Sequence, residues 1–322
     1  MPLPTDKKVV DTGKELLGIF KDLAAHAKGI LLKGSFVPTA EAAALSRAPH
    51  FNQASTPVIV RFSSSTDIPQ IPDNDPNGNP RGFALRFVLA EKPRRQHTDI
   101  IAHSTPFFPA ATPEETLAFF KAVSGAGTNP DAFSAFVAAH LSAQAFLAAP
   151  KPTPSAFTHE TFYSVNAFKL INAAGSEKYI RYRVVPVAGV DNLDDAAVKT
   201  KSATFLFDGV RSQIQAASAA REPIRFRLVA QVAQDGDVTD NNTVHWPDYG
   251  PEKRKEVTLG EVTLNSLVED DAAEQKYLIF DPVPRVDGIE SSEDPLLDLR
   301  AALYLLSGRE RRAASSERGG GE

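Results

Sequence analysis

Near its C-terminal end the chain carries a tyrosine and an arginine whose spacing suits metal ligation. In the segment Arg300-Ala-Ala-Leu-Tyr304 the two residues are four positions apart, so on a helix their side chains share one face. A phenol is a poor metal ligand while protonated, because its pKa is about 10, and a nearby cation stabilises the phenolate. The pair is a candidate for holding a metal-bound phenolate. The alternative is an ordinary surface pair on an amphipathic helix.

Near the other end, His26 is a candidate for proton transfer. The charge of a histidine changes near neutral pH, which suits a general acid–base role. His26 precedes Ala27-Lys28-Gly29, and we expect the glycine to let the backbone turn away behind the histidine. A purely structural histidine is the alternative.

The composition narrows the classes of protein that this chain can be. With 322 residues, 42% hydrophobic and 23% charged, it matches a globular protein of enzyme size, and its charge of −5 argues against a nucleic-acid binder. The absence of cysteine excludes disulfides, thiolate metal sites and iron–sulfur clusters, so a metal needs histidine, tyrosine, carboxylate or a cofactor. No apolar run approaches the ~18 residues of a membrane span, and no signal core is visible, so we expect a cytoplasmic protein.

These candidate residues need elements to position them, and the first half of the chain predicts helices and strands. The apolar stripe of residues 7–33 predicts a helix, and the β-branched and aromatic runs at 58–62 and 82–89 predict buried strands. The segment 67–79 is rich in Pro, Asp, Asn and Gly and predicts a loop. Thr112-Pro-Glu-Glu115 predicts a helix start, and a further helix is expected from Asn129 to about Ala149.

The second half predicts mainly antiparallel strands. We expect a hairpin of 162–172 and 179–187, then strands at 224–234, 257–267 and 276–281, and a closing helix that begins at Asp294-Pro295. Helices at both ends around many strands favour an α+β fold built on a closed antiparallel β-barrel. We predict one domain over residues 1–312 and a disordered tail over 313–322.

Several blocks of the sequence, taken together and in order, resemble the haem catalases. The blocks are His26-Ala-Lys-Gly29, Val60-Arg-Phe-Ser63, Asn79-Pro-Arg-Gly-Phe-Ala84, Asp99-Ile-Ile-Ala-His-Ser-Thr-Pro106, 162–172, 280–290 and 300–312. They cover most of residues 20–312. The chain is similar to the minimal, single-barrel branch of this family, the catalase-related peroxidases. The resemblance implies a haem, taken as b-type, that is buried against the barrel.

The resemblance also implies roles for individual residues. His26 would be the acid–base on one side of the haem, with Ser63 hydrogen-bonded to it. Tyr304 would be the iron ligand, with Arg300 as the partner of the phenolate. Arg61 and Arg311 match cations that pair with the haem propionates. Phe120, or its neighbour Phe119, would stack on the macrocycle unless it makes only a core contact.

Three positions depart from the family pattern. Typical catalases have an asparagine, whose amide orients the peroxide, where Ser104 stands; we expect Ser104 to replace it through a water molecule. The neighbouring His103 either points inward as a second titratable group or lies toward solvent at the barrel end. Ala25 replaces a valine, which widens the pocket, and Leu23 replaces an arginine that contacts a propionate.

The expected function is that of a haem-dependent peroxidase, which reduces hydrogen peroxide or organic hydroperoxides and has weak catalase activity. The alternatives are a fatty-acid hydroperoxide isomerase or dehydratase, a biosynthetic oxidase, or a non-enzymatic carrier of haem or an apolar ligand. The expected partners are a peroxide, a small-molecule electron donor and a second copy in a homodimer. The residues expected to carry the reaction are His26, Ser63, Ser104 and His103 as catalytic groups, Arg61, Phe120, Arg300, Tyr304 and Arg311 at the cofactor, and Tyr304 on the metal.

Overall fold

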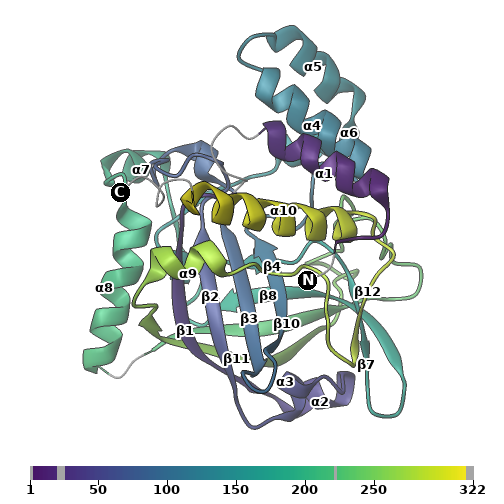
Figure 1. Ribbon diagram of the computed structural model, residues 1–322, viewed down its shortest axis with the longest axis vertical. Helices are drawn as coiled ribbons and strands as arrows, with labels where there is room; N and C mark the ends of the chain where they lie inside the picture. Colours follow the sequence, from purple (N-terminus) through teal and green to yellow (C-terminus); the bar gives the residue numbers. More distant parts are fainter. Residues whose placement is uncertain (1–2, 20–25, 221–222, 317–322) are drawn as a thin grey trace.

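The computed structural model describes residues 3–19, 26–220 and 223–316, and its centre is a closed antiparallel β-barrel (Figure 1). Eight strands form the ring in the order β10-β11-β1-β2-β3-β4-β6-β8, and β8 pairs back with β10 to close it. The strands of the ring are β1 (Gly29–Pro38), β2 (Thr56–Ser63), β3 (Gly82–Ala90), β4 (Gln96–His103), β6 (Phe162–Tyr163), β8 (Glu177–Pro186), β10 (Ile224–Val232) and β11 (Glu256–Leu267). The predicted closed barrel is therefore confirmed.

Four short strands lie outside this ring. Strand β7 pairs with β8, β12 pairs with β7, and β5 and β9 form a separate two-stranded sheet. Their bounds are β5 (Thr153–Pro154), β7 (Phe168–Ile171), β9 (Asn192–Leu193) and β12 (Ile289–Ser291).

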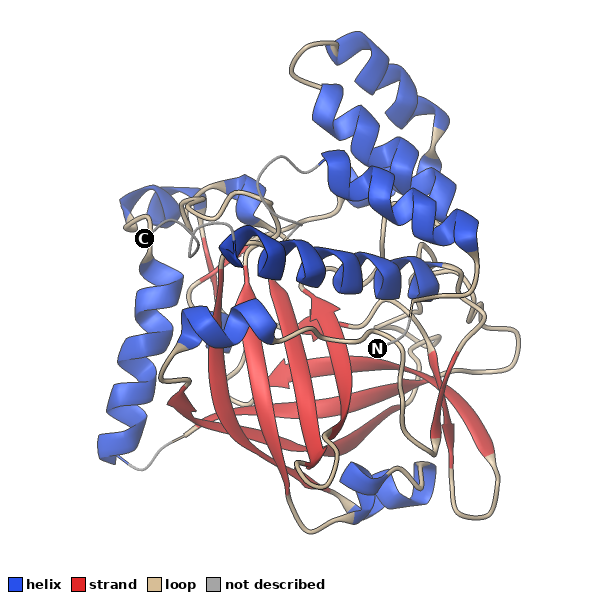
Figure 2. Ribbon diagram, in the orientation of Figure 1, coloured by secondary structure: helices blue, strands red, loops and turns tan. Residues whose placement is uncertain are grey.

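Helices surround the barrel (Figure 2). The long helix α10 crosses the front of strands β2 to β4, α1 packs on α10, and α4 packs on α1 and carries α5 and α6 away from the barrel (Figure 1). The helices are α1 (Lys7–Ile19), α2 (Ala40–Leu45), α3 (Pro49–Asn52), α4 (Pro113–Gly125), α5 (Pro130–Ala139), α6 (Leu141–Ala148), α7 (Asp195–Thr200), α8 (Phe205–Ala220), α9 (Asp271–Tyr277) and α10 (Leu296–Ser316), with 3₁₀ turns η1 (Pro76–Gly78) and η2 (Phe157–His159). No helix in the described ranges combines the length and the apolarity that crossing a membrane requires.

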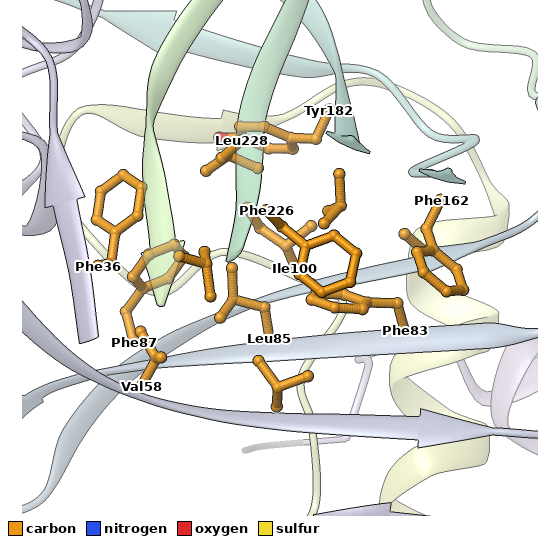
Figure 3. Close-up of a cluster of buried hydrophobic side chains, with 14 of the residues drawn as sticks. Phe36, Val58, Phe83, Leu85, Phe87, Ile100, Phe162, Tyr182, Phe226 and Leu228 are labelled. Atoms are coloured by element: carbon orange, nitrogen blue, oxygen red, sulfur yellow. The ribbon is translucent and has the colours of Figure 1, made fainter. Parts of the chain in front are cut away.

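The barrel interior is filled by large apolar side chains (Figure 3). Successive residues of a strand point to opposite sides, so on β2 the inward set is Val58, Val60 and Phe62. The residues between them therefore face outward, toward α10. The labelled interior residues are Phe36, Val58, Phe83, Leu85, Phe87, Ile100, Phe162, Tyr182, Phe226 and Leu228.

Several predicted elements are wrong or end elsewhere. Residues 29–33, predicted as helix, begin β1, whose pairing with both β2 and β11 outweighs the local apolar pattern. The predicted strand 276–281 is the end of α9 and the loop after it, because Asp270 caps α9 through Ala273 N. The predicted helix from Asn129 divides at His140 into α5 and α6.

The predicted strand 162–172 is divided into β6 and β7, because residues 164–167 are not in a strand. The other predicted strand and helix boundaries fall close to the observed ones. Thr112 caps α4 as expected, accepting a hydrogen bond from Glu115 N, and Asp294 accepts one from Leu296 N at the start of α10. Helix α8 had no counterpart among the predicted elements. Helix α10 runs to Ser316, so residues 313–316 of the expected tail are helical, and residues 317–322 lie outside the described residues.

Candidate active site

A cavity of about 270 Å³ is lined by residues of α10 and of strands β2, β3 and β4. Most of its wall is apolar, from Leu, Phe, Ile and Ala side chains. Polar side chains interrupt this apolar wall, which is typical of a ligand pocket with specific anchoring groups. The polar lining residues are His26, Arg61, Ser63, His103, Thr116, Asn242, Gln275, Arg300, Tyr304, Ser307 and Arg311.

The barrel wall of this cavity is built from rows of outward-facing residues on adjacent strands. In the ladder, Ser63 pairs with Gly82, and Gly82 pairs with His103. Two residues further along, Arg61 pairs with Ala84, and Ala84 pairs with Ile101. Gly82 and Ala84 of the middle strand β3 are small and leave room above the strand. Side chains from β2 and β4 therefore face one open space.

His26 lies over the first of these rows. It has a left-handed backbone conformation with φ of 67°, which is uncommon for a residue other than glycine, and its Nδ1 is 3.1 Å from Ser63 Oγ. Burial and the nearby Arg61 guanidinium lower the pKa of His26 to about 4, although a backbone hydrogen bond with Ser64 opposes the shift. The imidazole is therefore neutral at pH 7 and able to accept a proton.

Two glycines make this arrangement possible through the space that they leave. A Cβ on Gly29 would lie 2.2 Å from Arg61 Nη2, so this glycine admits the guanidinium. The expectation that Gly29 makes the turn is wrong, because the left-handed conformation falls on His26 itself. A Cβ on Gly82 would lie 2.3 Å from Ser63 Oγ and 2.8 Å from His26 Nδ1. Gly82 thus makes room for the contact between the serine and the histidine.

Replacement of Gly82 by alanine is expected to destabilise the protein by about 1–3 kcal/mol, because the added methyl group must displace Ser63 Oγ in a packed environment. The free energy of unfolding, measured by urea denaturation, tests this. Gly209→Ala in α8 is the matched control, since a Cβ there would meet nothing within 4 Å. Equal stabilities of the two variants would contradict the prediction.

Arg61 ties the His26 segment to the rest of the site. Its Nη2 donates to the carbonyl oxygens of His26 at 2.9 Å and Ala27 at 3.3 Å, and its Nε donates to Gln275 Oε1 at 2.8 Å. Burial and the like charge of Arg311 lower the pKa of Arg61 to about 10. Two cations thus stand close together at one edge of the cavity, which favours an anionic ligand there.

Helix α10 supplies the opposite wall. Tyr304 interacts electrostatically with Arg61 and Arg311, the two cations at the cavity edge. Arg300 lies one turn earlier and lines the same cavity, as predicted. In the described part of the chain, however, its guanidinium donates to Asn166 Oδ1 and makes no hydrogen bond with Tyr304.

The structure distinguishes between the two neighbours at the end of β4. His103 lines the cavity, so of the two predicted orientations the inward one is observed. Ser104 does not line it: Ser104 Oγ accepts a hydrogen bond from Arg81 N at 2.9 Å, and its N–H donates to Arg81 O. The expectation that Ser104 faces a bound peroxide does not fit this position, because adjacent residues of a strand point in opposite directions.

Other predicted and unpredicted residues complete the wall. Phe120 lines the cavity, whereas Phe119 packs behind it. Ala25 and Leu23 lie outside the described residues, so the widened pocket and the lost propionate contact stay predictions. The sequence did not predict Asn242 as a site residue, but it lines the cavity. Its side chain is buried, and in the described structure its Nδ2 and Oδ1 have no hydrogen-bond partner. Its position next to Asn241 in a polar loop carried no signal of a pocket.

The sequence of the chain is similar to those of known proteins. A sequence model described as catalase matches residues 21–317. A catalase-related peroxidase of Synechococcus elongatus is 32% identical over 289 residues, covering 88% of this chain and 81% of the relative. A catalase-related peroxidase of Mycolicibacterium paratuberculosis is 30% identical over 287 residues, covering 88% and 87%.

Solved structures show the same fold. Catalase A from Saccharomyces cerevisiae superimposes with a TM-score of 0.75 at 20% identity, covering 90% of this chain and 61% of the catalase. A fungal catalase gives a TM-score of 0.75 at 21% identity, covering 90% and 59%. The chain thus spans about 60% of the length of these two solved catalases.

Proposed function

Because the chain belongs to the catalase family, we propose that it is a haem-dependent peroxidase that reduces hydrogen peroxide or organic hydroperoxides and has weak catalase activity. A small-molecule electron donor would complete each turnover. The observation that carries this proposal is the presence of the His26–Ser63 pair and Tyr304 in a single, mostly apolar cavity. The isomerase alternative depended on Ala25, and no described feature favours it.

The chemistry of the cavity wall suits a haem. Its apolar side chains, Phe120 among them, fit a flat macrocycle. The adjacent cations Arg61 and Arg311 suit the propionates, because a carboxylate between them would relieve their mutual repulsion. Tyr304 would offer a phenol oxygen to the iron of a bound haem, since tyrosine is the haem ligand of catalases. The charges of Arg61 and Arg311 interact with Tyr304, and Arg300 lies one turn before it on α10 and lines the same cavity.

A bound haem would supply an iron centre that gives two electrons to the peroxide and recovers two electrons from the donor. The chain itself supplies the proton transfer. His26 is neutral at pH 7 and is oriented by Ser63, so its ring can take a proton from a peroxide and return it to the leaving oxygen.

Weak catalase activity is expected because a full catalase cycle oxidises a second peroxide in the same pocket. At the end of β4, His103 and Ser104 stand where the family has its asparagine-containing segment. His103 is bulkier than asparagine and occupies the inward position. The second peroxide therefore has less room beside the haem than it would have next to an asparagine, whereas a reducing donor can give up its electrons at the haem edge.

The absorption spectrum of the purified, haem-supplied protein tests the proposal. We expect a ferric Soret band with high-spin, phenolate-type features, which shifts on addition of one equivalent of hydrogen peroxide and recovers with a phenolic donor. Absence of a Soret band after haem is supplied would contradict haem binding. A Soret band that ignores peroxide would contradict the peroxidase activity while leaving haem binding intact.

A further inference from the structure

His103 is the second imidazole in the cavity, and its two ring nitrogens have different surroundings. Nδ1 is 2.6 Å from Thr105 Oγ1. Nε2 is buried and has no hydrogen-bond partner in the described structure, and the residue lines the cavity. One nitrogen is thus fixed by the protein, and the other is left for a ligand.

The Thr105 contact favours one tautomer of the ring. Thr105 is fully buried, and within the described residues its hydroxyl has His103 as its side-chain partner. A hydroxyl has a single hydrogen to donate. If Nδ1–H donated to Thr105, that hydroxyl hydrogen would be left buried without an acceptor, which proteins rarely tolerate. The hydroxyl therefore donates to Nδ1, and the ring hydrogen resides on Nε2.

The surroundings of His103 also keep the ring neutral. Burial, together with the charge of Arg300 and that of His26 when it is protonated, lowers its pKa to about 3. A neutral ring with a fixed tautomer remains a hydrogen-bond donor at neutral pH. It resembles in this respect the N–H of a side-chain amide.

His26 is held in a different way. A backbone hydrogen bond with Ser64 raises the pKa of His26, which is the effect of an acceptor for a ring N–H. The Nδ1 of His26 lies 3.1 Å from Ser63 Oγ, so Nε2 is the nitrogen left to accept a proton. The cavity therefore presents one imidazole as a base and one as a donor.

We propose that His103 Nε2–H donates a hydrogen bond to the peroxide bound in the cavity, and that Thr105 is the positioning residue that holds this tautomer. The inference rests on the proposed function and adds to it the residue that orients the substrate. It assigns to His103, with the help of Thr105, the role expected of an asparagine amide.

Four variants test the hydrogen-bond donor His103 and the positioning residue Thr105 separately. His103→Leu removes the donor, whereas His103→Asn replaces it by an amide donor. Thr105→Val removes the hydroxyl with little change of shape, and Thr105→Ser retains it. His97→Leu is the matched control, because His97 lies on the same strand and does not line the cavity. Thermal unfolding of each variant confirms that it is folded.

The first readout is the affinity of the haem-loaded ferric protein for cyanide, followed by the Soret band, because iron-bound cyanide accepts a hydrogen bond from a donor beside it. We expect affinity about tenfold weaker in His103→Leu, which is the loss of roughly one hydrogen bond. His103→Asn, Thr105→Ser and His97→Leu should bind as the wild type does, and Thr105→Val should fall between. Equal affinity of His103→Leu and the wild type would overturn the proposal and leave the proposed function standing.

The second readout does not need haem. In ¹⁵N NMR spectra of the purified protein, the His103 ring signals, identified by their loss in His103→Asn, should show hydrogen on Nε2. Thr105→Val should shift the population toward the other tautomer. Hydrogen on Nδ1 in the wild type would overturn the proposal. Failure to take up haem would instead contradict the proposed function, and the peroxide contact with it.

Discussion

His26→Ala is expected to slow the reaction with hydrogen peroxide by about 10²–10⁴-fold, the usual contribution of a general acid–base, while the haem content stays unchanged. The alanine removes the group that takes the peroxide proton. It leaves Tyr304, Arg61 and Arg311, which would hold the cofactor, in place. Stopped-flow measurement of the Soret shift gives the rate constant, and haem per chain is determined on the same samples.

The pH dependence of the same rate constant checks the assignment. The pKa of His26 is lowered to about 4, so the base is available at neutral pH and is lost only as the pH falls through that value. The wild-type rate should be flat from about pH 7 to about pH 5 and decline below it. His97→Ala should behave as the wild type. An unchanged rate in His26→Ala would show that another group takes the proton.

Tyr304→Phe is expected to reduce retained haem by at least about tenfold, since even the loss of residues that only support a metal ligand commonly costs 10–100-fold in affinity. Phenylalanine keeps the ring and its packing beside Phe280 and Leu278 but removes the oxygen that would bind iron. Haem titration followed by gel filtration measures retention. The phenolate-type features should vanish from the spectrum of any haem that remains.

Tyr277→Phe is the control for this change, because Tyr277 is 61% exposed at the end of α9. It should bind haem as the wild type does. Full haem retention by Tyr304→Phe, with an unaltered spectrum, would contradict the proposed ligand.

Much of the barrel could be predicted from the sequence because its strands have strong local signals. The buried runs of β2, β3, β10 and β11 are rich in β-branched and aromatic residues, and their boundaries fall close to the predicted ones. Strand β1 was missed because its apolar residues continue the helical pattern of the preceding segment. Its pairing with β2 and β11 is a tertiary property that no local window contains.

The sequence predicted some residues of the site and misplaced one role among the residues at the end of β4. The block resemblance indicated His26, Ser63 and Tyr304, and the fold brings all three to one cavity. It placed the peroxide-orienting position on Ser104, although the inward residue is His103. Neighbouring side chains at a strand end point to opposite sides. The sequence alone does not say which of the two sides faces the cavity.

Arg300 illustrates a further limit of sequence spacing. Four residues on a helix place Arg300 and Tyr304 on one face, but a long arginine side chain can reach several partners. It donates to Asn166, which in turn donates to Asp294 at 2.7 Å. Asn166 comes from a loop more than a hundred residues earlier, so its presence beside α10 follows only from the folded chain.

Arg61 links the cavity to the supply of its cofactor. The Arg61 guanidinium donates to the carbonyl oxygens of His26 and Ala27 and lies close to the charge of Arg311. Only the folded chain brings these groups together, so a dianionic ligand at this edge would bind the folded chain and not the unfolded one. At a hundredfold excess over its Kd, such a ligand stabilises the fold by about 2.7 kcal/mol. In a cell, chains without haem would spend more time unfolded and be degraded first. The abundance of this protein should therefore follow the haem status of its host.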